Sequence, residues 1–164
     1  MTDYRDVVRL AGVLAEAVGG EADAAAVWPI LDAVLGEAVG HRLFTVLIHD
    51  GGSGTVTRCY SSRPEEYPVQ GSKQMGPTPW GDLLLVRGKP FLGIDEAGIR
   101  WAFPDHDLIL SMGLGSAINL PVRVAGRTLG TLNLLHEAGH YRGAHLETGA
   151  LFAAIVAPLM QVSG

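Results

Sequence analysis

Cysteine is nearly absent from this sequence, which contains only Cys59 among its 164 residues. One thiol excludes an intramolecular disulfide framework and any CxxC site. Cys59 lies in a predicted strand beside Arg58, whose charge could lower the thiol pKa and make a nucleophile. We favour the other interpretation, a buried and unreactive thiol.

Basic residues are also scarce. Twelve Lys and Arg stand against 17 Asp and Glu, which gives a formal net charge of −5, and the basic residues form no run. Because nucleic-acid-binding surfaces are usually strongly basic, we expect no nucleic-acid partner.

Long hydrophobic runs are missing as well. No apolar run reaches the roughly 18 residues of a membrane helix. The first ten residues, MTDYRDVVRL, lack the basic region and apolar core of a secretory signal peptide. We therefore expect a cytoplasmic protein with no membrane partner. The length predicts one domain over 1–164, with terminal helices in 1–38 and 141–164 around a sheet and pocket region in 39–140.

The clearest element is a hairpin between Gly113 and His136. Apolar and polar residues alternate from Ala117 to Val124, which predicts a strand with two different faces. Ala125-Gly126 supplies a two-residue turn, and Thr128 to Leu135 returns as a second strand. Asn119 and Asn133 both lie among apolar neighbours, so both faces of this central pair should be covered.

The two-residue turn also predicts a register. Leu120 is expected opposite Thr131, and Ile118 opposite Asn133. Asn119 would then point to the other side of the sheet, so that each face carries one asparagine.

Periodicity predicts the remaining elements. Helices are expected over 3–18, over 23–38 and over 144–162. Pro29 requires the second helix either to begin near Trp28 or to kink there. The strands are expected at 41–50, 54–61, 90–95, 116–124 and 127–136, with a sixth within 66–76. Short helices are expected from Pro79 to Val86 and from His106 to Met112. The fold class is therefore α/β of the α+β type, an antiparallel sheet of about six strands with helices on both faces.

Several stretches resemble the GAF domain family. Ala117 to Leu135 carries the family's closing hairpin as AINLPV, a Gly turn and LGTLNL. GHRLFTVLIHD at 40–50, YSSRPEEYPV at 60–69 and FPDHDLILSMGLGS at 103–116 extend the resemblance to a stand-alone bacterial GAF protein over nearly the whole chain. The resemblance implies a small-molecule pocket between the sheet and segments 61–112.

Aromatic and polar residues near those segments are candidates for ligand binding. Trp80, Trp101 and Phe103 would supply aromatic walls, although ordinary core packing explains them equally well. Arg58 and Tyr60, together with Lys73, could donate to an anionic ligand, or could decorate the surface. The candidate ligand-binding residues are Arg58, Tyr60, Trp80, Trp101, Phe103, Asp105, His106, Ser116 and Asn119.

Some of these candidates have competing explanations. Asp105 is explained as the N-cap of the following short helix, whereas His106 has no structural explanation from sequence. Ser116 and Asn119 lie three residues apart on one strand, so only one of them should face the pocket. The sequence identifies no catalytic residue and no cofactor.

The letters HEAGH at 136–140 match the zinc-protease motif. That motif needs a helix that places both histidines on one face. Here the preceding residues form a predicted strand and Gly139 weakens a helix, so we expect a solvated turn and no metal. A looser metal site from His136, His140 or His145 is the alternative.

Three functions remain open. The first is a small-molecule-binding GAF module acting as a sensor or regulator. The second is a small soluble enzyme on the same fold acting on a small polar metabolite, although no nucleophile and base are evident. The third is a structural dimer. A homodimer through the terminal helices is expected because the last helix has a second apolar stripe, Phe152, Ile155, Leu159 and Val162.

Overall fold

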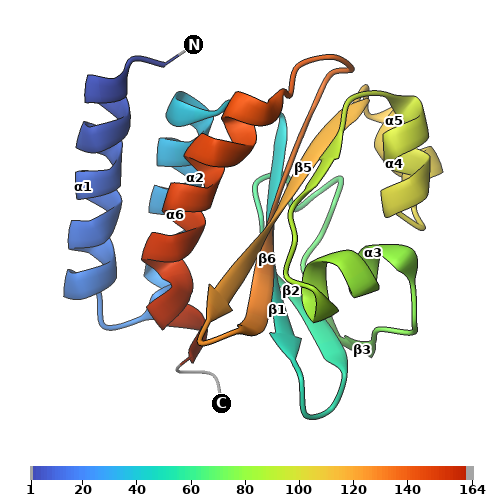
Figure 1. Ribbon diagram of the computed structural model, residues 1–164, viewed down its shortest axis with the longest axis horizontal. Helices are drawn as coiled ribbons and strands as arrows, with labels where there is room; N and C mark the ends of the chain where they lie inside the picture. The colour runs from blue at the N-terminus through green and yellow to red at the C-terminus, as the bar shows by residue number, and fades with distance from the viewer. Residues whose placement is uncertain (1, 162–164) are drawn as a thin grey trace.

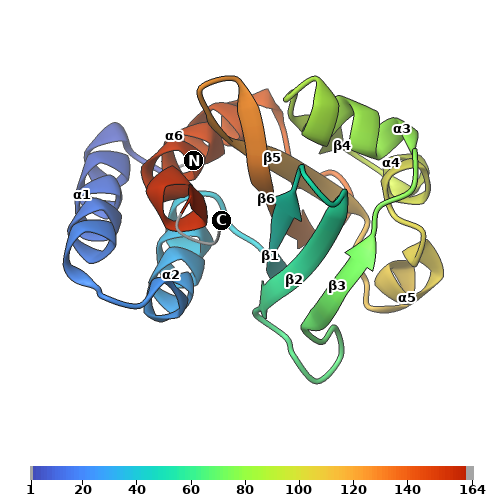
Figure 2. The same cartoon turned by 90° about the horizontal axis from the view of Figure 1, so that it is seen from below.

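A six-stranded antiparallel sheet separates two layers of helices (Figures 1 and 2). The computed structural model describes residues 2–161. The spatial order of the strands is β3-β2-β1-β6-β5-β4. They are β1 (Leu43–Asp50), β2 (Thr55–Ser61), β3 (Gln70–Gln74), β4 (Phe91–Gly93), β5 (Ser116–Val124) and β6 (Arg127–His136). The fold class is as predicted, and β3 is the sixth strand expected within 66–76.

The helices divide between the two faces of the sheet. One layer contains α1 (Tyr4–Gly20), the 3-10 turn η1 (Ala24–Ala26), α2 (Trp28–Ala38) and α6 (Gly143–Gln161). The other contains α3 (Pro79–Gly81), the π-helical turn η2 (Asp82–Val86), α4 (Glu96–Ala102) and α5 (His106–Ser111). Figure 2 shows the sheet between these layers, and Figure 1 shows α1 farthest from the sheet, beyond α2 and α6.

Local chemistry explains where the first helices begin. The Asp3 side chain accepts a hydrogen bond from Arg5 N and caps α1. Helix α2 begins at Trp28, so Pro29 lies in the first turn, where its missing N–H costs no helical hydrogen bond. Of the two alternatives for Pro29, the later start is correct.

Helix α6 is buried from two directions within one chain. Phe152 is fully buried and Leu159 is 9% exposed, because α6 packs on β5 on one side and on α1 on the other. Phe152 and Leu159 belong to the second apolar stripe of this helix. The expectation that this stripe would stay exposed for a partner subunit is therefore wrong. Ile155 is partly buried in the same core, and Val162 lies outside the described residues.

The central hairpin has the predicted turn but a different register. Ala125 and Gly126 have φ values of 51° and 80°, and Val124 pairs with Arg127. A bulge between Val122 and Arg123 then shifts the pairing by one residue. Because a one-residue shift reverses the face of every side chain, Asn119 lies directly opposite Asn133. The prediction of one asparagine on each face is wrong, since both lie on the same face.

A second bulge interrupts β2. Leu47 pairs with Arg58, but Val46 pairs with Tyr60, so Cys59 is the additional residue on its strand. Arg58 and Tyr60 are two residues apart and would share a face on a regular strand. The bulge directs Tyr60 toward the helical layer of α1, α2 and α6 and leaves Arg58 on the other side.

Candidate functional site

A cavity of about 230 Å³ lies on the sheet face that α1, α2 and α6 do not cover. Its base is formed by β1, β2 and β6, and its sides by residues 67–80 and 102–105. There are two larger hollows. One, of about 750 Å³, lies beside the β1–β2 and β5–β6 turns. The other, of about 640 Å³, lies between the first residues of α1 and α6 and the last residues of α2. The smaller cavity is the candidate site because buried side chains of the sheet form its base.

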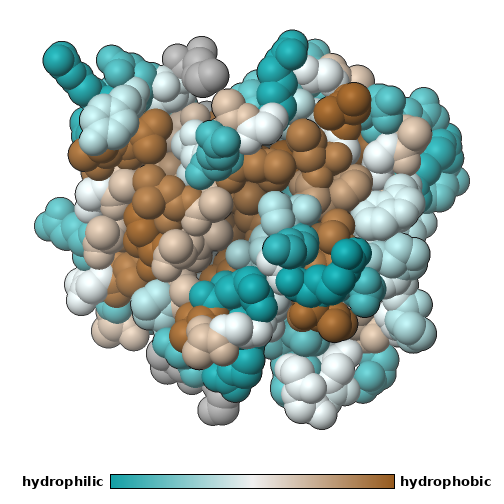
Figure 3. Space-filling view, viewed as in Figure 1, coloured by the Kyte–Doolittle hydropathy of each residue, from teal (hydrophilic) through white to brown (hydrophobic). Residues whose placement is uncertain are grey.

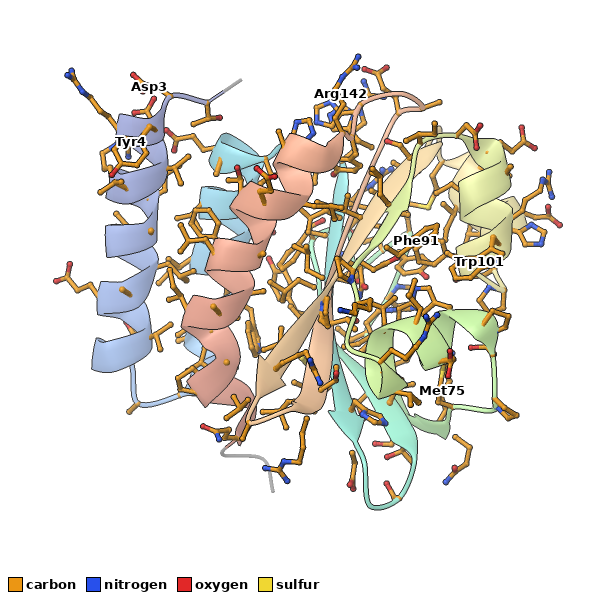
Figure 4. The ribbon with its side chains drawn as sticks, viewed as in Figure 1. Asp3, Tyr4, Met75, Phe91, Trp101 and Arg142 are labelled. Atoms are coloured by element: carbon orange, nitrogen blue, oxygen red, sulfur yellow. The ribbon has the colours of Figure 1, made fainter. Side chains whose placement is uncertain are left out.

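The cavity has apolar walls. Trp80 is 6% exposed and is held by α3, whose first turn is capped by Thr78 and begins at Pro79. Met75 contributes from the segment before α3 (Figure 4). The apolar lining side chains are Leu47, Val56, Met75, Trp80, Ala102, Phe103 and Pro104.

Polar side chains form a connected chain across the sheet. Trp80 Nε1 donates to Asn119 Oδ1 over 3.1 Å. Asn119 Nδ2 donates to Asn133 Oδ1 over 2.7 Å, and Asn133 Nδ2 donates to Thr45 Oγ1 over 3.2 Å. We call this chain the Trp80 relay. It joins α3, β5, β6 and β1, and all of its members except Asn119 line the cavity.

Charged groups surround the outer part of the cavity. The Arg58 guanidinium carbon lies 3.9 Å from the Tyr67 ring centroid, and Arg58 donates to the Pro68 carbonyl over 2.9 Å. Asp105 and Lys73 complete the charged lining. Burial is the main reason that the pKa of Tyr67 lies well above its usual value, and the Asp105 carboxylate adds to it while Arg58 opposes it. Tyr67 is therefore a neutral hydroxyl at physiological pH.

Asp105 is not the helix cap that the sequence predicts. It precedes α5, but its side chain accepts no capping hydrogen bond, and its ψ of 33° is not the extended geometry of a typical N-cap. The carboxylate lies at the cavity. Arg58, Trp80, Phe103 and Asp105 are thus brought together by the structure, and Asn119 joins them through Trp80.

Trp101 and His106 do not line this cavity. Trp101 is 46% exposed and stacks on Phe91 with ring centroids 4.8 Å apart (Figure 4). His106 lies at the surface, with its Nδ1 3.1 Å from Asp107 Oδ1 and 3.2 Å from Arg100. Both are placed outside the cavity because α4 and α5 turn these side chains outward.

Tyr60 and Ser116 point to the opposite face of the sheet. Tyr60 donates to Asp32 Oδ2 over 2.6 Å, which ties β2 to α2. Ser116 donates to the Glu137 carbonyl over 2.6 Å. Of Ser116 and Asn119, therefore, Asn119 is on the cavity face. Ligand binding by any of the candidate residues stays a prediction.

Sequence reasoning missed three buried side chains with polar groups that line the cavity, Thr45, Tyr67 and Asn133. Thr45 and Asn133 are 3% and 2% exposed, and each is a polar residue between apolar neighbours in a strand. That pattern was a usable signal for both. Tyr67 is 5% exposed although it lies in a loop rich in Pro and Glu. It is the single aromatic residue of that loop, and this was the available signal.

Cys59 lies on the side of the sheet away from the cavity. Its Sγ is 3.7 Å from the Val46 carbonyl oxygen, and the side chain packs against the core beneath α2 and α6. Burial raises the pKa of the thiol to about 11. The thiol is therefore protonated at neutral pH, as expected for an unreactive buried cysteine.

The HEAGH stretch is not helical. His136 ends β6, and its ring stacks on that of His140 with centroids 3.6 Å apart and 6° between the planes. His145 also stacks on His140, with ring centroids 5.2 Å apart. Among residues 2–161, no three His, Cys, Asp or Glu side chains are arranged to hold a metal ion.

No protein-family model matches the sequence, and no curated protein matches it either. Several solved structures are similar to this chain. The GAF domain of a phosphoenolpyruvate-protein phosphotransferase from Coxiella burnetii has a TM-score of 0.77 at 14% identity, over 99% of this chain and 96% of that one. The nlh2 GAF domain from A. aeolicus, in an inactive state, has 0.74 at 16%, over 98% of both chains.

A third similar structure has a bound small molecule. The free methionine-R-sulfoxide reductase from Neisseria meningitidis, in complex with its substrate, has a TM-score of 0.68 at 20% identity, over 99% of this chain and 94% of that one. All three align along almost the whole chain, so the order and arrangement of helices and strands is shared from end to end.

Proposed function

We propose that this chain, which has the GAF fold, is a small-molecule-binding module that acts as a cytoplasmic sensor or regulator. The observation that carries the proposal is the cavity between the sheet and segments 61–112. Its apolar walls, buried polar base and charged outer residues are the usual composition of a small-molecule site. The reductase from N. meningitidis, solved with its substrate, supports ligand binding on this fold.

The enzyme alternative finds less support. Cys59, the one thiol of the sequence, is on the far side of the sheet from the cavity and is protonated. The hydroxyl of Tyr67 has a raised pKa and is not poised to act as a base. Binding is therefore the function that the geometry favours.

A thermal-shift screen against a metabolite library tests the proposal, because a ligand that binds only the folded state raises the melting temperature. Phe103→Ala removes a cavity wall and should weaken a hit by roughly ten- to a hundredfold, because less apolar surface then encloses the ligand. Trp101→Ala is the matched control, since this neighbouring aromatic side chain lies outside the cavity. A library without hits, or a hit that Phe103→Ala leaves unchanged, would contradict the proposal.

A further inference from the structure

The direction of every hydrogen bond in the Trp80 relay is fixed by chemistry. An indole N–H can only donate, so the Asn119 atom that faces it must be the side-chain oxygen. The Asn119 amide nitrogen is then left to donate to Asn133 Oδ1. The Asn133 nitrogen in turn donates to Thr45 Oγ1. All donors therefore point from Trp80 toward Thr45.

This direction leaves two hydrogens without an acceptor at the cavity. The Thr45 oxygen accepts the hydrogen bond from Asn133, so the Thr45 hydroxyl hydrogen is free to be donated to another group. Asn133 uses one of its two amide hydrogens in the relay and keeps the other. Within residues 2–161 neither hydrogen has a hydrogen-bond acceptor. Both residues line the cavity and are almost fully buried.

Buried donor hydrogens without an acceptor are rare in folded proteins and costly. A ligand that accepts both hydrogens would remove that cost. A group that offers only donors, such as an ammonium, could at most donate to the second lone pair of the Thr45 oxygen, and it would leave the Thr45 hydroxyl hydrogen and the Asn133 amide hydrogen unpaired. The base of the cavity therefore selects for one type of chemical group.

We propose that the ligand places an oxygen acceptor that carries no hydrogen at the inner end of the cavity, as a ketone, amide or carboxylate does. This oxygen accepts from the Thr45 hydroxyl and the Asn133 amide, while Leu47, Val56 and Phe103 enclose the apolar body. The proposal rests on the proposed function, because it names the ligand class of the same cavity. Thr45 is thereby the residue that determines specificity.

Two probes of matched shape test the proposal. Acetophenone carries a carbonyl oxygen where α-methylstyrene carries a CH₂ group. Their dissociation constants are measured by NMR titration of the wild type and of Thr45→Val, Thr45→Ser and Thr131→Val. Thr45→Val should weaken acetophenone about three- to tenfold, as expected for one hydrogen bond, and should not weaken α-methylstyrene.

The other two variants are controls. Thr45→Ser keeps the hydroxyl and should keep the wild-type ratio of the two constants. Thr131→Val makes the same substitution on the neighbouring strand, outside the cavity lining, and should change neither constant. If both probes bind but Thr45→Val leaves their ratio unchanged, the ligand class is wrong while the proposed function stands. If neither probe binds the wild type while the metabolite library gives a hit that Phe103→Ala weakens, the ligand class is wrong and the proposed function stands; if the library gives no hit either, both proposals fail.

A measurement on the wild type covers the case in which Thr45→Val does not fold. The infrared carbonyl stretch of bound acetophenone, labelled with ¹³C, should lie below its frequency in an apolar solvent, because an accepted hydrogen bond weakens the C=O bond. A stretch at the apolar-solvent frequency would overturn the proposal.

Discussion

Two threonines on the cavity face of the sheet differ in whether their hydroxyls are used. Thr45 accepts a hydrogen bond from Asn133, whereas Thr131 Oγ1 is buried without any partner among the described residues. A buried hydroxyl that lacks a partner is destabilising, and one that serves a buried amide is stabilising. The same substitution should therefore have opposite effects at the two positions.

We expect Thr131→Val to raise the free energy of unfolding by about 1 kcal/mol, because it removes the unpartnered hydroxyl. Thr45→Val should lower it by about 1–3 kcal/mol, because Asn133 loses its acceptor. Urea unfolding of both variants, monitored by tryptophan fluorescence, measures the difference. Two changes of the same sign would contradict the hydrogen-bond pattern.

The stacked histidines predict a pH dependence. Burial, followed by the proximity of His140, lowers the pKa of His136 and of His145 below the usual value of about 6.5. The folded state therefore favours their neutral forms, and the stability that they contribute is present above pH 6.5 and is lost as the pH falls below it.

We accordingly expect the free energy of unfolding to fall between pH 7 and pH 5. Replacing His136 and His145 with Gln should flatten this decline. His49→Gln, at the opposite end of the sheet, should leave it unchanged. Urea unfolding at each pH is the measurement, and an equal slope in the double variant would rule out the stack as the cause.

At the scale of the elements, sequence patterns predicted strands and helices well but not the register. Alternation identified β5 and β6 because apolar residues repeat at period two on both sides of the turn. It could not reveal a bulge, because the same alternation resumes after the additional residue with its faces reversed. The two bulges direct Tyr60 away from the cavity face and bring Asn133 onto it beside Asn119, and neither placement is visible in the alternation of the sequence.

The close approach of β6 to β1 depends on Gly130. A Cβ at this position would overlap the Leu47 carbonyl oxygen and lie 2.8 Å from Met160 Sδ. We expect Gly130→Ala to destabilise the protein by about 1–3 kcal/mol, because backbone must move to make room. Gly71→Ala in β3, where a Cβ would meet nothing within 4 Å, is the control and should be neutral or slightly stabilising. Thermal unfolding of the pair distinguishes local crowding from a general effect of alanine in strands.

At the scale of the whole molecule, the apolar composition of α6 is compatible with two environments, a membrane and a protein core. Helix α6 is the one helix among residues 2–161 that is long and apolar enough to cross a membrane by length and composition. Core helices of soluble proteins meet the same criterion, and α6 packs against α1, α2, β5 and β6. Its apolar character is explained by these contacts.

The homodimer expected from the sequence stays a prediction, now on different side chains. Tyr4, Val8 and Leu151 are 77%, 52% and 44% exposed on α1 and α6, where Figure 3 shows apolar surface. Burying such side chains stabilises an interface by about 1.5–3 kcal/mol each, and a two-fold arrangement would pair this surface with itself.

Sedimentation at micromolar concentration tests this association. We expect a dimer for the wild type and a shift toward monomer for Leu151→Glu. Val86→Glu is the control, because Val86 is 73% exposed on η2, across the sheet from α1 and α6. A wild-type species at the monomer mass of 17.3 kDa would exclude the dimer.

The separation of the cavity from the helical core by one sheet has a consequence for evolution. Along each central strand, alternate residues serve different purposes: Thr45 belongs to the cavity, whereas Phe44 and Val46 belong to the core under α2 and α6. Substitutions at one set of positions therefore leave the side-chain contacts of the other set in place. A protein built in this way can change its ligand through cavity side chains outside the Trp80 relay, such as Leu47 and Phe103, while the core under α2 and α6 is kept.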